Sequence, residues 1–173
     1  MANIYIVEGD IEEKFLYYVQ PKLSTSRLGK IRQFNLMQNK LSNSNNILNQ
    51  KYSSIFCIID TDCITNTHLD TFIYNIKLLK TIGSVTIFVQ NKNFEDELLY
   101  VLNCKTISTL CQALNLHKPK NTKVDLKKHL SQKEQYQFIT KQHLKKYCSR
   151  PSTFQSLINQ HHSKTPINIA PHF

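Results

Sequence analysis

The sequence has little glycine and no tryptophan. Only three glycines occur among 173 residues, and neither G-x-x-x-x-G-K-[ST] nor G-x-G-x-x-G is present. Phosphate-binding loops of these types need glycine because the backbone itself must approach the phosphates closely. The scarcity of glycine therefore argues against a P-loop and against a glycine-rich dinucleotide site.

Cysteine is also sparse and forms no motif. The five cysteines include no C-x-x-C pair and their number is odd, which indicates neither a zinc ribbon nor a disulfide framework. The first residues have the pattern of a strand, without a basic stretch followed by a long apolar segment. We therefore expect no signal peptide and no membrane span, and a cytoplasmic protein with reduced cysteines.

Acidic residues are outnumbered by basic ones. The chain has 12 Asp and Glu against 22 Lys and Arg, a formal net charge of +10. This excess favours a polyanionic partner such as nucleic acid, because each phosphate that a basic side chain neutralises releases counterions. A basic surface without such a partner is the alternative. In a chain so poor in acidic residues, grouped carboxylates require an explanation.

Hydrophobic patterning predicts an α/β fold. Apolar β-branched and aromatic runs predict buried strands at 3–7, 54–59 and 84–89, and weak alternation predicts a short edge strand at 30–36. Apolar residues at helical spacing, with their flanking signals, predict helices at 11–20, 39–49, 65–80 and 93–101, the first capped by Asp10. This order predicts a mostly parallel four-stranded sheet flanked by helices.

The chain changes in character after about residue 104. Residues 1–104 are expected to form the first domain, and residues 105–173 a basic helical extension packed on it. Helical patterns occur around 106–116, 124–130 and 134–146, a further helix starts at about 150–154, and a poorly ordered tail is expected from about residue 161. Basic side chains, most of them in the extension, are candidate nucleic-acid contacts: Lys92, Lys123, Lys127, Lys128, Lys141, Lys145 and Arg150.

Two groups of carboxylates follow predicted strands. Glu8 comes directly after the first strand, and Glu12 lies four residues later, where a helix can direct it back over the turn towards Glu8. Asp60 and Asp62 follow the 54–59 strand with a spacing that lets both point to one side. If these two strands are neighbours, four carboxylates meet at the carboxyl edge of the sheet, and such oxygen ligands suit Mg²⁺ or Mn²⁺.

These acidic residues also have ordinary explanations. Glu12 can be a solvent-facing helix residue, and Asp60 can simply cap the following helix. Glu95 lies in the first turn of the predicted 93–101 helix, where a negative charge stabilises the N-terminus whether or not it binds a metal. The order and placement of the groups together favour a metal site over chance.

The run E-G-D-I-E at residues 8–12, followed by D-T-D at residues 60–62, resembles the signature of the Toprim domain. The E-G-x-x-E opening and the later run N-x-x-F-E at residues 91–95, followed by leucine, are similar to those of stand-alone RloB-like and OLD-type Toprim nucleases of prokaryotic defence systems. The resemblance covers roughly residues 3–102. The chain departs from it in having Asn-Lys-Asn-Phe-Glu where Asn-Pro-Cys-Phe-Glu is usual, and no single lysine aligns with the distal lysine of OLD-type enzymes.

The resemblance implies a Toprim (Rossmann-like) fold and a role for each acidic residue. Glu8 would be a general acid/base or a metal-bridging carboxylate, and Asp60 and Asp62 would bind Mg²⁺ or Mn²⁺. Glu12 would complete this site or extend it to a second metal. Glu95 would be an additional ligand.

The resemblance also implies a metal-dependent endonuclease that cleaves phosphodiester bonds, with RNA such as tRNA favoured over DNA, and a role in antiphage defence. The chain has no ATPase motif, so regulation would come from a partner such as a regulatory ATPase, or from self-assembly into a homo-oligomer. The alternatives are a catalytically silent nucleic-acid-binding or regulatory subunit and a primase-like nucleotidyl transferase.

Overall fold

The computed structural model describes residues 2–22, 29–62, 64–114, 126, 128, 130, 136, 139–150, 153–161, 167 and 169–170. The elements, in chain order, are β1 (Asn3–Val7), α1 (Asp10–Val19), the 3-10 turn η1 (Gln20–Lys22), β2 (Gly29–Gln33), β3 (Ser54–Asp60), α2 (Asn66–Lys80), β4 (Ser84–Gln90), α3 (Phe94–Val101), α4 (Ile107–Ala113), α6 (Lys141–Lys146) and α7 (Phe154–His161). Most of the helical pattern predicted at 124–130 lies outside the described residues.

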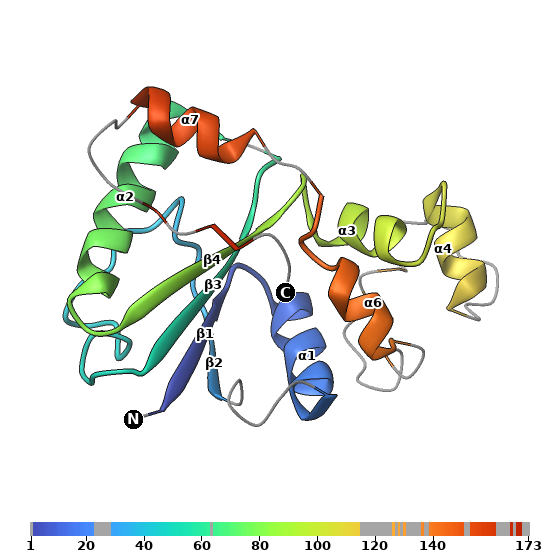
Figure 1. The fold of residues 1–173 in the computed structure, drawn as a ribbon, viewed down its shortest axis with the longest axis horizontal. Coiled ribbons are helices and arrows are strands. Elements are labelled where there is room, and N and C mark those ends of the chain that lie inside the picture. The colour runs from blue at the N-terminus through green and yellow to red at the C-terminus, as the bar shows by residue number, and fades with distance from the viewer. Residues whose placement is uncertain are drawn as a thin grey trace.

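The four strands form one parallel sheet in the order β2-β1-β3-β4 (Figure 1). This confirms the predicted α/β fold with a four-stranded sheet flanked by helices, an arrangement compatible with a Rossmann-like fold. The chain moves outward from β1 to β2 on one side and from β3 to β4 on the other. The strand order therefore reverses between β1 and β3, and open α/β sheets bind their ligands at the carboxyl end of such a switch point.

Helices cover both faces of the sheet. Helices α1, α3 and α6 lie on one side of the sheet, and α2 and α7 on the other (Figure 1). Alternate residues of β1 point to opposite faces, so that Tyr5 and Val7 belong to the core with α1, α3 and α6, while Ile4 and Ile6 belong to the core with α2 and α7. Right-handed crossovers that run in opposite directions from the switch point place α1 and α2 on opposite faces. Each face thus has its own apolar core. The carboxyl ends of the strands, between these two cores, position the polar residues.

The helices next to the sheet begin close to where the sequence predicts. Thr65 caps α2 by accepting a hydrogen bond from the His68 amide, and Asn93 caps α3 by accepting one from the Asp96 amide. The predicted cap at Asp10 is wrong. The N-cap of α1 is Gly9, and Asp10 is a helical residue that pairs with Lys14 at 2.8 Å.

The helix predicted at 39–49 is wrong, because this segment forms a series of turns. The Asn45 side chain accepts a hydrogen bond from the Ser42 amide, and the buried Asn75 side chain accepts one from the Leu41 amide while donating to the carbonyls of Leu36 and Asn39. Asn and Ser side chains satisfy the backbone locally in this way and compete with helix formation. Leu41 and Ile47 are nevertheless buried in the α2-side core.

The chain after residue 104 packs against both faces of the sheet. The helix predicted at 134–146 is shorter than expected: Ile139 and Thr140 are not helical, and Thr140 caps α6. Ile169 forms a parallel bridge with Ile87, where the Ala170 amide donates to the Ile87 carbonyl at 2.8 Å. In the described part of the chain, no helix has the length and apolar character needed to cross a membrane.

Candidate active site

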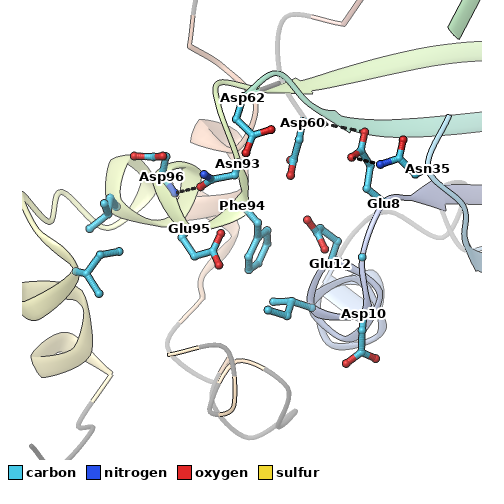
Figure 2. A pocket seen from close by; sticks show the side chains of 14 residues that line it. Glu8, Asp10, Glu12, Asn35, Asp60, Asp62, Asn93, Phe94, Glu95 and Asp96 are labelled. Carbon is cyan, nitrogen blue, oxygen red and sulfur yellow. Dashed lines mark hydrogen bonds between the residues drawn. The ribbon is translucent and has the colours of Figure 1, made fainter. Parts of the chain in front are cut away.

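The acidic residues Glu8 and Asp60 lie together at the switch point. Glu8 follows β1 directly, and Asp60 is the last residue of β3, the neighbouring parallel strand. The Asp60 amide donates to Glu8 Oε1 at 3.3 Å (Figure 2). The condition on which the sequence prediction depended, that these two strands are neighbours, is met.

Asn35 is a further polar residue of the site, and sequence reasoning missed it. Its Nδ2 donates to Glu8 Oε2 at 2.9 Å (Figure 2). Its Oδ1 accepts from the amides of Met37 and Gln38 at 3.0 and 2.9 Å. Both polar atoms of the Asn35 side chain are thus hydrogen-bonded, and Asn35 holds the Glu8 carboxylate in place. Its only sequence signal is its position just after β2, whose carboxyl end lies at the same edge as that of β1.

Glu12 points back into the site, as its position in the first helical turn predicts. Glu12 is only 7% exposed, and its carboxylate lies between Glu8, Asp60 and Glu95 (Figure 2). A Cβ built on Gly9 would lie 2.6 Å from Glu12 Oε2. Gly9 has an extended backbone, with φ of −129°, so glycine is needed here for space and not for its conformational freedom.

Asp62 and Glu95 complete the acidic lining. Figure 2 shows both carboxylates directed towards the site, whereas Asp10 and Asp96 point away from it. The pocket has a volume of about 750 Å³. Its lining residues come from the carboxyl edge of the sheet and from α1, α3 and α4: Glu8, Gly9, Asp10, Ile11, Glu12, Asn35, Asp60, Asp62, Asn93, Phe94, Glu95, Asp96, Leu99 and Ile107.

The electrostatics of the site favour protonated carboxyl groups. Burial raises the pKa of Glu8 from 4.5 to about 7, against the hydrogen bond from the Asp60 amide, and Glu12 and Asp62 raise it further. Burial and the charges of Glu12, Glu8, Asp62 and Glu95 raise the pKa of Asp60 from 3.8 to about 9. Asp60 Oδ1 is buried and has no hydrogen-bond partner. A cation here would relieve both the repulsion and the unsatisfied oxygen.

The donor set fits a hard divalent cation. Carboxylate oxygens are the ligands that Mg²⁺ and Mn²⁺ prefer. Among the described residues, however, no three His, Cys, Asp or Glu side chains are close enough together to hold an ion as they stand. The carboxylates line a common pocket without converging on one point.

The predicted nucleic-acid contacts fall into three groups. Lys92, Lys128, Lys141 and Lys145 are exposed, while Lys123 and Lys127 lie outside the described residues. Arg150 is different, because its guanidinium is bound within the protein: it pairs with Glu97 at 2.8 Å and also donates to the Asn91 carbonyl. The structure thus gives Arg150 a structural role that its basic surroundings in the sequence do not suggest.

Glu97 is a second residue that sequence reasoning missed. It is fully buried on α3 and accepts hydrogen bonds from Arg150 and from the amides of Cys148 and Asn91. Its place in an acidic first turn predicts only a favourable charge at a helix N-terminus, because its partner Arg150 lies far along the chain.

The resemblance to known proteins rests on the residues themselves. The acidic residues at 8, 12, 60, 62 and 95 line one pocket. The family assignment remains a prediction, and the fold is established as α/β with a parallel sheet. No family model, no curated protein and no solved structure matches this chain.

Proposed function

We propose that this protein is a Toprim-type, Mg²⁺-dependent nuclease that hydrolyses phosphodiester bonds. The observation that carries the proposal is the meeting of Glu8, Glu12, Asp60 and Asp62 at the switch point, with the buried Asp60 Oδ1 left without a partner. Burial and the neighbouring like charges make the ionised form of such a group unfavourable unless a cation compensates it. The acidic pocket and the basic remainder suit a metal enzyme that acts on a polyanion.

Each acidic side chain has a defined task in this proposal. Asp60 and Asp62 hold Mg²⁺ or Mn²⁺ together with Glu8, and Glu12 and Glu95 complete the site. When bound, the metal supplies neutralisation of the scissile phosphate, orientation of a water molecule and stabilisation of the leaving oxygen. Removing the carboxylate of Glu8, Asp60 or Asp62 should therefore abolish cleavage and leave the fold intact.

Glu8 is the candidate general acid/base. The Asp60 amide and the Asn35 side chain each hold one of its oxygens, which fixes the orientation of the carboxyl group. A proton-transfer group works best when its pKa lies near the operating pH, and burial raises the pKa of Glu8 to about 7. As a general acid/base, the alternative to its role as a metal-bridging carboxylate, Glu8 would accept a proton from an attacking water and release it to the leaving oxygen.

The proposed substrate is RNA, such as a tRNA, in preference to DNA, and the proposed setting is antiphage defence. Both follow from the resemblance to RloB-like and OLD-type proteins. The exposed Lys92, Lys128, Lys141 and Lys145 provide positive charge for the substrate backbone. A regulatory ATPase, another defence protein or self-assembly would control the activity.

A catalytically silent nucleic-acid-binding subunit is the second candidate. The observation in its favour is that no three of the described acidic or histidine side chains are close enough to hold an ion as they stand. In that case the protein would bind nucleic acid through its basic surface, and the acidic pocket would play no part in cleavage.

The two candidates are separated by cleavage assays on total RNA and plasmid DNA with Mg²⁺, Mn²⁺ or EDTA. For the nuclease, we expect metal-dependent cleavage by the wild type that is lost in Glu8→Gln and Asp60→Asn and kept in Glu13→Gln, a matched change one position from Glu12. Cleavage that survives both site substitutions would rule out the metal site. Binding of RNA without cleavage by the wild type would favour the silent subunit.

A further inference from the structure

Thr61, which lies between Asp60 and Asp62, is hydrogen-bonded to β4 and to the segment that follows it. The Thr61 amide donates to the Lys92 carbonyl at 2.7 Å, and the Lys92 amide donates to Thr61 Oγ1 at 3.0 Å. Thr61 Oγ1 donates in turn to the Gln90 carbonyl at 3.0 Å. The hydrogen-bonded pairing of β3 with β4 ends at Asp60 and Gln90. The three bonds of Thr61 therefore continue the contact between the two segments past the end of the strands.

The turn that holds Thr61 has an unusual backbone. Lys92 has φ of 76°, in the left-handed region, although it is not glycine. This conformation is unfavourable for a residue with a Cβ, and it persists where the surrounding structure imposes it. It is the conformation in which both the amide and the carbonyl of Lys92 bond to Thr61.

Asn91, the residue before Lys92, is held by hydrogen bonds with Glu97 and Arg150. Glu97 Oε2 accepts from the Asn91 amide at 3.3 Å and from Arg150 at 2.8 Å, and the same Arg150 nitrogen donates to the Asn91 carbonyl at 2.9 Å. Glu97 Oε1 accepts from the Cys148 amide at 2.9 Å. Both backbone polar groups of Asn91 are thus held by one buried ion pair, whose arginine comes from the segment after α6.

We propose that Thr61, Glu97 and Arg150 are positioning residues of the acidic site. The buried ion pair fixes Asn91, the adjoining Lys92 fixes Thr61, and Thr61 fixes the directions of Asp60 and Asp62 on either side of it. The segment after α6 therefore contributes to metal binding without contributing a ligand. This inference rests on the proposed function to the extent that Asp60 and Asp62 bind the metal.

A positioning role and a purely fold-stabilising role predict different results. Residues that orient metal ligands typically change metal affinity by about 10–100-fold when they are replaced. A hydrogen bond that only stabilises the fold changes the free energy of unfolding and leaves the affinity of the folded protein unchanged. Metal affinity, measured on folded protein, is therefore the decisive quantity.

The test is direct Mn²⁺ binding, followed by the electron paramagnetic resonance signal of free Mn²⁺ and by calorimetry. Thr61→Val keeps the size of the side chain and removes both hydroxyl bonds, so we expect about 10-fold weaker Mn²⁺ binding. Thr61→Ser keeps the hydroxyl and should restore the wild-type affinity. Thr81→Val is the matched control, because Thr81 Oγ1 donates to the carbonyl of Leu78 in the last turn of α2, which lies at the other end of the strands from the acidic site.

Arg150→Met extends the test to the segment after α6, below the melting temperature of the variant and with its fold checked by circular dichroism. We expect its Mn²⁺ affinity to fall in the same direction as that of Thr61→Val. Wild-type affinity in folded Thr61→Val, or an equal loss in Thr81→Val, would overturn the proposal. Absence of Mn²⁺ binding by the wild type would instead contradict the proposed function, so the two failures are distinguishable.

Discussion

Two groups of buried and half-buried carboxylates lie near the carboxyl ends of the strands, and their charges are compensated differently. Glu97 is fully buried, and Arg150 and two backbone amides satisfy it. Glu8 and Asp60 face Glu12, Asp62 and Glu95, and burial with these like charges raises the pKa of Asp60 to about 9. Among the described residues, no Lys or Arg lines that pocket.

The contrast shows that the fold is able to neutralise a buried carboxylate when the role is structural. Arg150 compensates Glu97 within the chain, whereas the Glu8 and Asp60 group keeps a buried oxygen without a partner. A lysine or arginine side chain at that group would occupy the space that a metal ion and a phosphate need. The buried Asp60 oxygen without a partner thus fits a site that is completed from outside the chain.

Breaking the internal pair should have the largest effect on stability. Arg150→Met leaves Glu97 buried without its cation, and loss of one partner of a buried pair costs about 3–5 kcal/mol. We expect a decrease of this size in the free energy of unfolding, measured by urea titration. The double variant Glu97→Gln/Arg150→Met should recover part of the loss, because no isolated charge remains. Equal stability of the single variant and the wild type would show that the pair is not needed.

The pH dependence of stability should reveal the uncompensated group. Glu8 and Asp60 have raised pKa values, about 7 and about 9 against 4.5 and 3.8, so between about pH 4 and pH 9 the folded protein holds protons that the unfolded chain has lost. Its stability without metal must therefore fall as the pH rises through this window. Thermal melts in EDTA at pH 5 and pH 8 measure the slope.

Asp60→Asn removes the group with the higher pKa, so it should flatten this slope and raise the melting temperature at pH 8, by about 2–4 °C for each kcal/mol of relieved repulsion. Mg²⁺ should stabilise the wild type at pH 8 and should not stabilise this variant. A slope that is the same in wild type and variant would contradict the assignment.

The smallest change in stability is expected for Gly9→Ala. Its extended backbone suits alanine, and the added Cβ meets only the end of the Glu12 side chain, at 2.6 Å. We expect a change of less than about 1 kcal/mol in the free energy of unfolding. Because the Glu12 carboxylate must move, we expect about 10–100-fold slower cleavage.

Gly29→Ala is the matched control for Gly9→Ala. Its Cβ would lie 2.6 Å from the Asn3 carbonyl oxygen, which is backbone and cannot turn aside. This variant should therefore lose stability while its folded fraction cleaves at the wild-type rate. If Gly9→Ala cleaves as fast as the wild type, the carboxylate of Glu12 is not needed at its present position.

The sheet and the acidic pocket could be predicted because their signals are local. Apolar β-branched runs end at Glu8 and Asp60, and parallel strands place their carboxyl ends at one edge. The turns at 39–49 could not be predicted from apolar spacing, because Asn75, distant in sequence, satisfies their backbone. The role of Arg150 was also hidden. Its partner Glu97 is 53 residues away, and a basic residue in a basic segment carries no sign of burial.

The bridge between Ile169 and Ile87 has a consequence for how the chain folds during synthesis. Phe154, Ile158 and Ile167 belong to the core on the α2 face, and Ile169 pairs with β4. The ribosome releases residues in order, so β4 emerges long before the segment that pairs with it. During that interval the strand presents unpaired backbone groups, which are a template for association with other chains. Expression at a lower temperature, or with a holdase chaperone, should therefore increase the soluble yield.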